Sequence, residues 1–369
     1  MPNSLLVNLS FLAAKPTGIS TYANNLYPHL QSLDPTLLIS PDAYEGGHGG
    51  AMPLRRGFDC YPVPGNLTPD YGTSGHLRRL LWTQFQLPQI YQKLRSHLLF
   101  SPVPEAPLIS HCRYIVNVND LIPLRFPKRF SPLTPYFQYY IPQVLTQAEH
   151  IVCISKATAN DIIKFYQISA AKITPILLAH DAEHFRFLDL PTRNYFLYIG
   201  RQDPYKNLQR AIAAFAALPN RREYELWFAG PFDPRYTPDL QALATQLEVS
   251  DCVRFLDYVK YQDLPTLINQ AIALVFPSLW EGFGLPVLEA MACGTPVITS
   301  NLSSLPEVAG EAALLVNPYN TAEITAAMQA IATEAGLRSH LSKLSLARAQ
   351  SFSWAKTGQA TIEVLARYL

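Results

Sequence analysis

Short apolar runs alternate with amphipathic segments along most of the chain, and this alternation restricts the fold more than any other feature. Strands that alternate with helices form parallel α/β sheets. In the first half, strands are predicted at 4–10, in the second part of 108–120, and at 150–155. In the second half they are predicted at 195–200, 224–230, 252–259, 271–278, 295–300 and 312–317. The chain is therefore expected to be an α/β protein with parallel sheets.

The domain boundary is predicted near 177–194, where helix and strand signals lapse and polar and proline residues gather. The first domain would be 1–185 and the second 186–352, each long enough for its own core. The segment 353–369 has an apolar face and Ser353 as an N-cap, and is expected to form a helix that packs back toward the first domain. The simplest architecture is two Rossmann-like domains with a cleft between them.

Composition excludes several classes of protein. Charged residues make up 15% of the chain and the net charge is +1, so no overall field favours nucleic acid. The cysteines are odd in number and contain no CxxC pair, which favours reduced thiols in a cytosolic protein and disfavours zinc; they are Cys60, Cys112, Cys153, Cys252 and Cys293. The N-terminus lacks the pattern of a secretory signal, and no apolar run reaches the ~20 residues that span a bilayer. We expect a cytoplasmic protein that is soluble or rests on a membrane.

The stretch SLWEGFGLPVLEAMACGTPVITS (278–300) carries the strongest sign of a ligand site. A strand ends before it, Pro286 suits the first turn of a helix, and Gly294 suits the helix end. Glu281 would then lie on a loop at the carboxyl edge of the sheet, where ligands of α/β folds bind. Glu289 would lie about one turn into the helix.

The start of this helix is suited to a phosphate group. Backbone N–H groups around Phe283, Gly284 and Leu285 would point outward with the positive end of the helix dipole. Gly282 and Gly284 would let a ligand approach the backbone closely. This part of the chain therefore predicts an anion-binding turn.

The two glutamates extend that site toward a sugar. Glu281 can hydrogen-bond hydroxyls of a group attached to the phosphate, and Glu289 can bind a vicinal diol such as ribose, which together describe a nucleotide sugar. On spacing alone a second interpretation stays open. Glu281 would then be a solvated loop residue, and Glu289 a helix residue favoured by the dipole.

The string EGFGLPVLEAMACGTPVITS closely resembles the EX7E signature of the retaining glycosyltransferases of family 4, which have a GT-B fold of two facing Rossmann-like domains. Further stretches resemble the family in its own order, at 15–26, 80–102, 117–127, 151–162, 195–215, 303–320 and 352–359. The resemblance spans nearly the whole chain. It implies a hexosyltransferase of polysaccharide biosynthesis, close to the mannosyltransferases. The donor would be GDP-mannose, or else a UDP-sugar, without a metal or other cofactor.

The resemblance also implies roles for individual residues. Glu281 would contact the donor sugar near the reacting carbon, Glu289 would hold the ribose, and the amides of 283–285 would hold the diphosphate. Arg201 and Lys206 would neutralise the leaving diphosphate. Independently of the family, cations pointed at a departing diphosphate lower the barrier by several kcal/mol, so no metal is needed. The alternative for both cations is surface charge beside a loop.

In the first half, Gly18 is expected to open a helix and to let donor phosphate or acceptor approach the backbone, with an ordinary turn as the alternative. The family's His-Asp pair is replaced by Asn119 and Asp120. Asn119 keeps a polar side chain and the same carbonyl but cannot titrate, which implies altered donor preference, lowered activity or a backbone role. Asp120 either positions its loop or meets the acceptor, or is a turn or cap residue.

The acceptor is expected to bind the first domain and to be a glycan or a lipid-linked molecule with a free hydroxyl. The segments 75–100 and 125–142 combine Leu, basic and aromatic residues. Such segments can rest on an anionic membrane, here the inner face of the cytoplasmic membrane, or can be amphipathic helices with basic outer faces.

Two other functions stay open on the sequence. The first is an inactive or weakly active relative that only binds nucleotide or glycan. Asn119, in place of the family's histidine, leaves this alternative open. A GT-B nucleotide-sugar epimerase is a further alternative, although the EX7E string belongs to transferases. A dehydrogenase is disfavoured, because no GxGxxG follows a strand.

Overall fold

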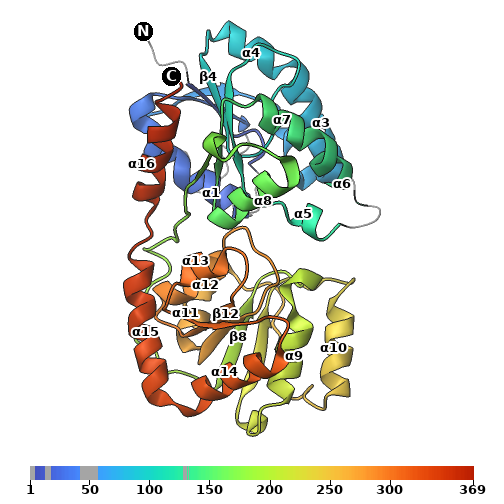
Figure 1. The fold of residues 1–369 in the computed structure, drawn as a ribbon, viewed down its shortest axis with the longest axis vertical. Coiled ribbons are helices and arrows are strands. Elements are labelled where there is room, and N and C mark those ends of the chain that lie inside the picture. Colours follow the sequence, from blue (N-terminus) through green and yellow to red (C-terminus); the bar gives the residue numbers. More distant parts are fainter. Residues whose placement is uncertain (1–4, 13–17, 42–56, 128–130, 132) are drawn as a thin grey trace. The chain divides into compact units, whose positions relative to one another are not determined.

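The computed structural model describes residues 5–12, 18–41, 57–127, 131 and 133–369. It divides into two compact units (Figure 1). The first unit runs to Leu178 and takes in Trp354–Leu369, and the second is Ala179–Ser353. Parts of the predicted glycine loop (15–17) and of the basic aromatic segment (128–130 and 132) lie outside the described residues.

The boundary falls between Leu178 and Ala179 instead of after residue 185. The polar segment that was assigned to the first domain packs on the second unit. Phe185 is buried, and the His184 ring stacks on Tyr261 with ring centres 3.9 Å apart. The Tyr261 hydroxyl donates to the Asp181 carboxylate over 3.3 Å. These contacts join residues distant in sequence, so local signals placed the boundary too late.

The first unit contains a seven-stranded parallel sheet in the order β3-β2-β1-β4-β5-β6-β7. Its strands are β1 Leu5–Asn8, β2 Thr36–Ile39, β3 Asp59–Pro62, β4 Leu98–Ser101, β5 Tyr114–Val118, β6 His150–Cys153 and β7 Ile173–Pro175. The predicted strands correspond to β1, β5 and β6. The other four strands were not predicted. β3 is largely exposed, and β4 follows directly on residues with a helical pattern.

Helices cover both faces of this sheet (Figure 1). Their bounds are α1 Gly18–Leu26, α3 Gly72–Phe85, α4 Leu87–Lys93, α5 Ile122–Arg125, α6 Leu133–Pro135, α7 Ile141–Gln147, α8 Lys156–Tyr166 and α16 Trp354–Leu365. A π-helical turn, Tyr136–Tyr140, leads into α7. On one face Leu6, Leu99 and Val116 pack with residues of α3, α4 and α7 in one apolar core.

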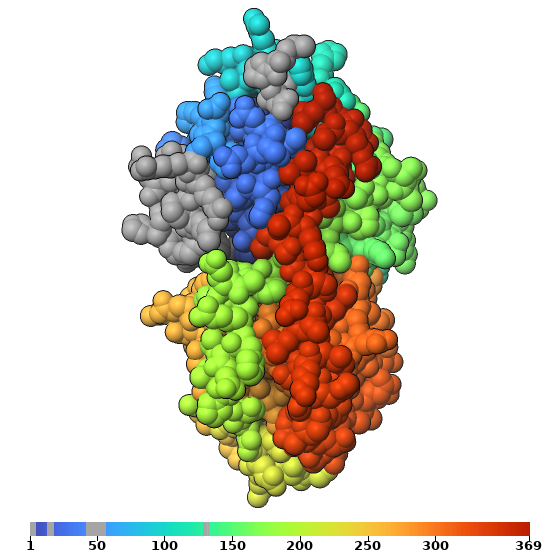
Figure 2. Space-filling view, turned by 90° about the vertical axis from the view of Figure 1, so that its left-hand side faces the viewer, coloured from blue at the N-terminus to red at the C-terminus, as the bar shows by residue number. Residues whose placement is uncertain are grey.

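The final helix α16 completes the first unit. Figure 2 shows it, in red, against the blue N-terminal part of the chain. Gly358 lies so close to the 3₁₀ helix Tyr27–Leu33 that an added Cβ would stand 2.3 Å from the Cβ of His29. The Thr357 hydroxyl donates to the carbonyl of Leu177 over 2.7 Å. The chain therefore returns to its first unit at the end.

The second unit contains a six-stranded parallel sheet in the order β10-β9-β8-β11-β12-β13. Its strands are β8 Tyr195–Ile199, β9 Glu225–Ala229, β10 Val253–Phe255, β11 Ala273–Phe276, β12 Val297–Ser300 and β13 Leu314–Val316, all at predicted positions. Its helices are α9 Leu208–Ala216, α10 Thr237–Gln246, α11 Leu264–Gln270, α12 Leu285–Ala292, α13 Leu305–Ala309, α14 Thr321–Thr333 and α15 Ala335–Ala349. The strand order reverses between β8 and β11, so the carboxyl ends of these two strands mark the expected ligand position.

None of the helices within the described residues combines the length and the apolar character that a membrane span requires. The prediction of two parallel α/β domains is confirmed by the two sheets.

Candidate functional site

Three loops of the second unit meet at the carboxyl ends of β8, β11 and β13, and Asn207 joins them. Its buried side-chain amide donates to the carbonyls of Pro277, 3.0 Å away, and Pro318, 2.7 Å away. The N–H of Leu279 donates to the carbonyl of Tyr205 over 2.8 Å. Asn207 was not predicted as a site residue. Its only indication in the sequence was its position directly after Lys206.

Lys206 and Glu281 lie at the centre of these loops and form an ion pair. The Lys206 Nζ is 2.7 Å from Oε1 and 2.9 Å from Oε2 of Glu281. The ammonium group also lies over the rings of Tyr205 and Phe276, 5.1 and 5.4 Å from their centres. Glu281 is 8% exposed, so the interpretation of Glu281 as a solvated loop residue is wrong. A buried, paired carboxylate is typical of a built site.

Two serines hold the backbone of Glu281. The Ser303 hydroxyl accepts from the N–H of Glu281 over 2.9 Å and donates to its carbonyl over 3.0 Å. The Ser304 hydroxyl lies 3.0 Å from the carbonyl of Glu281 and 2.7 Å from that of Phe283. Ser303 has a φ of 57°, in the left-handed region that a serine adopts only when its surroundings require it. Neither serine was predicted as a site residue, although both stand at the start of the stretch 303–320.

The start of α12 leaves backbone donors free, as predicted. Within the described part of the chain, the N–H groups of Phe283, Gly284 and Leu285 donate to no protein acceptor. Gly284 has a φ of 110°, and a Cβ there would lie 2.7 Å from Leu305 Cδ2. Gly282 is buried between the predicted sugar and phosphate positions. Free donors at the positive end of a helix are suited to a diphosphate.

Glu289 lies in the second turn of α12 and is partly buried. Burial, and then the negative charge of Asp181, raise the pKa of Glu289 to about 7. Its charge in turn raises the pKa values of Tyr261 and Cys293, after the larger effect of burial. Asp181, Tyr261 and Glu289 therefore form one polar region, to which the first residues of the second unit contribute.

Arg201 stands at the edge of the site. Its side chain is 73% exposed, with Nε 3.5 Å from Oδ2 of the buried Asp203. Its backbone is fixed, because the Tyr198 hydroxyl donates to its carbonyl over 2.6 Å. A Cβ on Gly230 would stand 1.9 Å from the carbonyl oxygen of Gly200, so the close approach of these two backbone segments requires glycine at position 230. The loop is rigid at its start and presents the guanidinium to solvent.

The predicted residues of the first unit lie after β5. The Asn119 side chain accepts from Asn117 Nδ2 over 3.2 Å, and its carbonyl accepts from the Thr158 hydroxyl over 3.4 Å. The Asp120 carboxylate accepts from the N–H of Ile122 over 3.0 Å, at the start of α5. This contact turns the chain ahead of α5, whose N-cap is Leu121, so it fits the turn residue among the alternatives for Asp120.

Gly18 is the first residue of α1 and is exposed. A Cβ added to it would meet no described atom within 4 Å, so the described fold does not require glycine here. Gly18, Asn119 and Asp120 belong to the first unit, and the other predicted site residues to the second.

Among the described residues, no three His, Cys, Asp or Glu side chains are grouped so that they would hold a metal ion. The polar groups described at these loops include the cations Arg201 and Lys206, the carboxylates Asp203 and Glu281, and the amides at the start of α12. This set can bind a diphosphate and hydrogen-bond hydroxyl groups.

Two family models match adjoining parts of the chain. The model described as Glycosyltransferase Family 4 matches residues 16–184, and that described as Glycosyl transferases group 1 matches 179–345. Their junction falls where the two units divide.

Among similar proteins, the O-antigen chain mannosyltransferase B of Escherichia coli is 32% identical over 62% of this chain and 63% of its own length. The O-antigen chain mannosyltransferase RfbU of Salmonella typhimurium is 28% identical over 85% of this chain and 87% of its own. The chain thus spans less than two thirds of the former relative and most of the latter.

Solved structures resemble the chain over nearly its whole length. Sucrose-phosphate synthase from Thermosynechococcus elongatus has a TM-score of 0.76 at 17% identity, over 98% of both chains. Anabaena Alr3699/HepE in complex with UDP-glucose has a TM-score of 0.75 at 16% identity, over 98% of this chain and 99% of that one. At such identities the likeness shows the fold, and the predicted GT-B fold class is confirmed.

Proposed function

Because this chain belongs to the glycosyltransferases of family 4 and group 1, we propose that it transfers a hexose from a nucleotide diphosphate sugar to a hydroxyl of a glycan or lipid-linked acceptor. The observation that carries this proposal is the site at α12. There the buried Glu281–Lys206 pair lies two residues from backbone amides with no protein acceptor. The transfer retains the anomeric configuration, as the family resemblance implies.

The donor we propose is GDP-mannose. The relatives named above are mannosyltransferases, which favours mannose as the sugar. A UDP-sugar is the second candidate, because a solved structure of the same fold holds UDP-glucose. In either case the diphosphate lies on the amides of 283–285, with Glu281 at the sugar and Glu289 at the ribose.

Catalysis then depends on positioning and on charge. Departure of the nucleotide diphosphate places negative charge on phosphate oxygens, which Arg201, Lys206 and the α12 amides stabilise. The acceptor hydroxyl enters on the face from which the diphosphate leaves, and the leaving phosphate takes its proton. No group of the protein must act as a base, and no metal is required. Asn119 and Asp120 of the first unit keep the roles that the family resemblance implies, at the donor sugar and at the acceptor.

Lys206 has a second task in this scheme. In the described part of the chain the polar contacts of the Lys206 side chain are with Glu281, so the lysine holds the carboxylate in one orientation. When a diphosphate arrives, the ammonium group has further donors for a phosphate oxygen, because it carries three N–H bonds. Lys206 would thus link the sugar-binding carboxylate to the leaving group.

We place the protein in the cytoplasm, with peripheral contact at the inner face of the membrane when the acceptor is lipid-linked. We propose that the product belongs to a polysaccharide, since the named relatives are O-antigen chain mannosyltransferases.

A panel of nucleotide sugars tests the proposal. GDP-mannose should raise the unfolding midpoint by several degrees and be hydrolysed slowly without acceptor, whether or not a chelator is present. UDP-glucose and UDP-galactose serve as comparison donors. The Glu281→Gln variant should keep the thermal shift and lose hydrolysis. If no nucleotide sugar shifts the midpoint, the transferase proposal fails in favour of a protein without donor binding.

A further inference from the structure

One helix of the first unit carries an apolar stripe on its outer face. On α3, Leu77, Leu81 and Phe85 are 57%, 51% and 66% exposed. Residues four apart lie on the same side of a helix, so the three side chains form one continuous row. Trp82 and Thr83 of the same helix are buried, so the opposite side faces the core.

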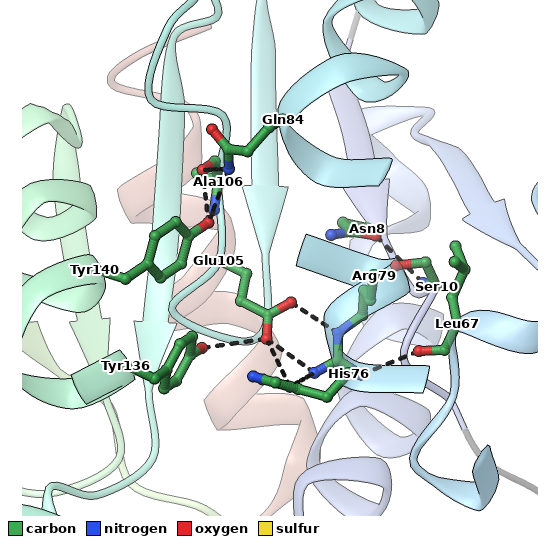
Figure 3. A network of polar contacts seen from close by, with 10 residues as sticks. All are labelled: Asn8, Ser10, Leu67, His76, Arg79, Gln84, Glu105, Ala106, Tyr136 and Tyr140. Carbon is green, nitrogen blue, oxygen red and sulfur yellow. Dashed lines mark hydrogen bonds and ion pairs between the residues drawn. The ribbon is translucent and has the colours of Figure 1, made fainter. Parts of the chain in front are cut away.

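The orientation of α3 is fixed by a buried polar network on its inner side (Figure 3). The Arg79 guanidinium donates to both carboxylate oxygens of Glu105, over 2.7 and 2.8 Å, and to the carbonyl of Leu67. The Tyr136 hydroxyl donates to the same carboxylate over 3.1 Å. Because Arg79 and Glu105 are almost fully buried, rotation of α3 would leave charges without partners. The apolar stripe is therefore held outward.

Two further segments also expose large apolar side chains, and Gln84 connects these segments to α3. Its amide accepts from the N–H of Leu108 over 2.9 Å and donates to the Tyr140 hydroxyl over 3.1 Å. The residues next to these partners, Ile109 and Tyr139, are 94% and 68% exposed. We call the set Leu77, Leu81, Phe85, Ile109 and Tyr139 the α3 patch.

The segment that carries α3 and α4 contains basic residues and no acidic ones. No Asp or Glu occurs from Tyr71 to Pro104, a range that includes all of α3 and α4. Arg78 is exposed on α3, one turn from Leu81, and has no acidic partner among the described residues. Lys93 and Arg95, at the end of α4, are exposed as well.

We propose that the α3 patch docks the first unit on a bilayer that contains anionic lipids. An outward apolar row flanked by basic residues and free of acids matches such a surface, where apolar side chains enter the headgroup region and cations meet the lipid charge. A lipid surface fits the patch better than a protein partner does. The exposed charged residues of α3 and α4 are all basic, whereas a typical protein interface carries charges of both signs. The docking would serve to reach a lipid-linked acceptor, and only this purpose rests on the proposed function.

Sedimentation with lipid vesicles tests the docking. The full chain should bind vesicles of phosphatidylglycerol and phosphatidylethanolamine, bind phosphatidylcholine vesicles weakly, and lose binding as salt rises. The double variant Leu81→Ser/Phe85→Ser should reduce the partition coefficient by about tenfold or more, and Arg78→Glu by roughly fivefold or more. Phe232→Ser and Tyr258→Ser remove exposed aromatics of the second unit, 52% and 68% exposed, and should bind as the natural chain does.

The unfolding midpoint and the thermal shift with GDP-mannose are measured for every variant, so that misfolding is recognised. Failure of the natural chain to bind anionic vesicles at low salt overturns the docking, and so does unchanged binding of the folded double variant. Light scattering covers a third outcome: if the double variant turns a dimer into a monomer, the α3 patch joins two copies of the chain instead. Vesicle binding without any nucleotide-sugar shift would leave the docking in place and reject the proposed function.

Discussion

Lys206 and Glu281, 75 positions apart in sequence, form a two-contact ion pair in which both side chains are about nine-tenths buried. The contact places a cation predicted for the diphosphate against a carboxylate predicted for the sugar. Each residue therefore depends on the other for its charge balance and its position, which makes the pair the first target for mutation.

Removal of one partner should be costly. In Lys206→Met the Glu281 carboxylate stays buried without its cation, and the free energy of unfolding should fall by about 3 kcal/mol. The double variant Lys206→Met/Glu281→Gln should recover part of this loss, because no buried charge remains. Urea unfolding measures stability, and single-turnover hydrolysis should fall by roughly a hundredfold or more in both variants. Equal stability of the single and double variants would contradict the pairing.

Two substitutions of Ser303 distinguish how much its hydrogen bonds and its backbone strain each affect stability. Ser303→Ala loses both bonds to the Glu281 backbone and keeps the left-handed φ, so it should be destabilised by about 2 kcal/mol. Ser303→Gly loses the same bonds but relieves the strain, so it should lose about 1 kcal/mol less. Turnover should fall in both variants, since the loop of Glu281 loosens. An alanine variant as stable as the glycine variant would show that strain at Ser303 plays no part.

Glu289 should make stability depend on pH. Its pKa is raised from an ordinary value of 4.5 to about 7, so the folded chain binds more protons than the unfolded chain between these values. The stabilisation is complete below pH 4.5 and is lost as pH rises through 7. Glu289→Gln should remove this dependence and should be more stable than the natural chain above pH 7, by about 1–3 kcal/mol. The check is urea unfolding across pH 5–8.5. Asp181→Asn, as control, should shift the transition to lower pH.

Glu289→Ala should act mainly on nucleotide affinity. The dissociation constant of GDP-mannose should rise by roughly tenfold or more, because a charged partner of the ribose hydroxyls is lost. Turnover at saturating donor should change little. A variant with unchanged affinity and lower turnover would place the residue at the reacting carbon instead.

Two glycines offer a matched comparison. Gly18→Ala adds a Cβ where no described atom lies within 4 Å, so thermal stability should be unchanged. Gly230→Ala puts its Cβ 1.9 Å from the Gly200 carbonyl, so about 3 kcal/mol or more of stability should be lost. Any loss of donor hydrolysis in the stable Gly18→Ala variant would then come from a ligand that approaches the backbone at this point. Thermal melts and hydrolysis rates of the two variants decide this.

Local sequence signals were sufficient for much of the fold. Every strand of the second sheet was predicted, because buried parallel strands are continuous apolar runs bounded by turn residues. The bounds of α12 followed from Pro286 in its first turn and Gly294 beyond its end, where φ is 72°. In the first unit β2, β3 and β7 were missed: β3 is largely exposed and so lacks a buried apolar run, and β7 has three residues and ends in a proline. β4 was missed because it continues a segment with a helical pattern.

The sequence by itself determined the fold class, and it located the carboxylates and cations of the candidate site and the turn at the start of α12, because each depends on residues close together in the chain. The tertiary structure alone decided which of these groups meet. Glu281 pairs with a lysine 75 positions away, and its backbone is held by a serine 22 positions away, at a φ that no local pattern predicts. Such contacts form only when the strands align side by side, so long-range packing determines them and local preference does not.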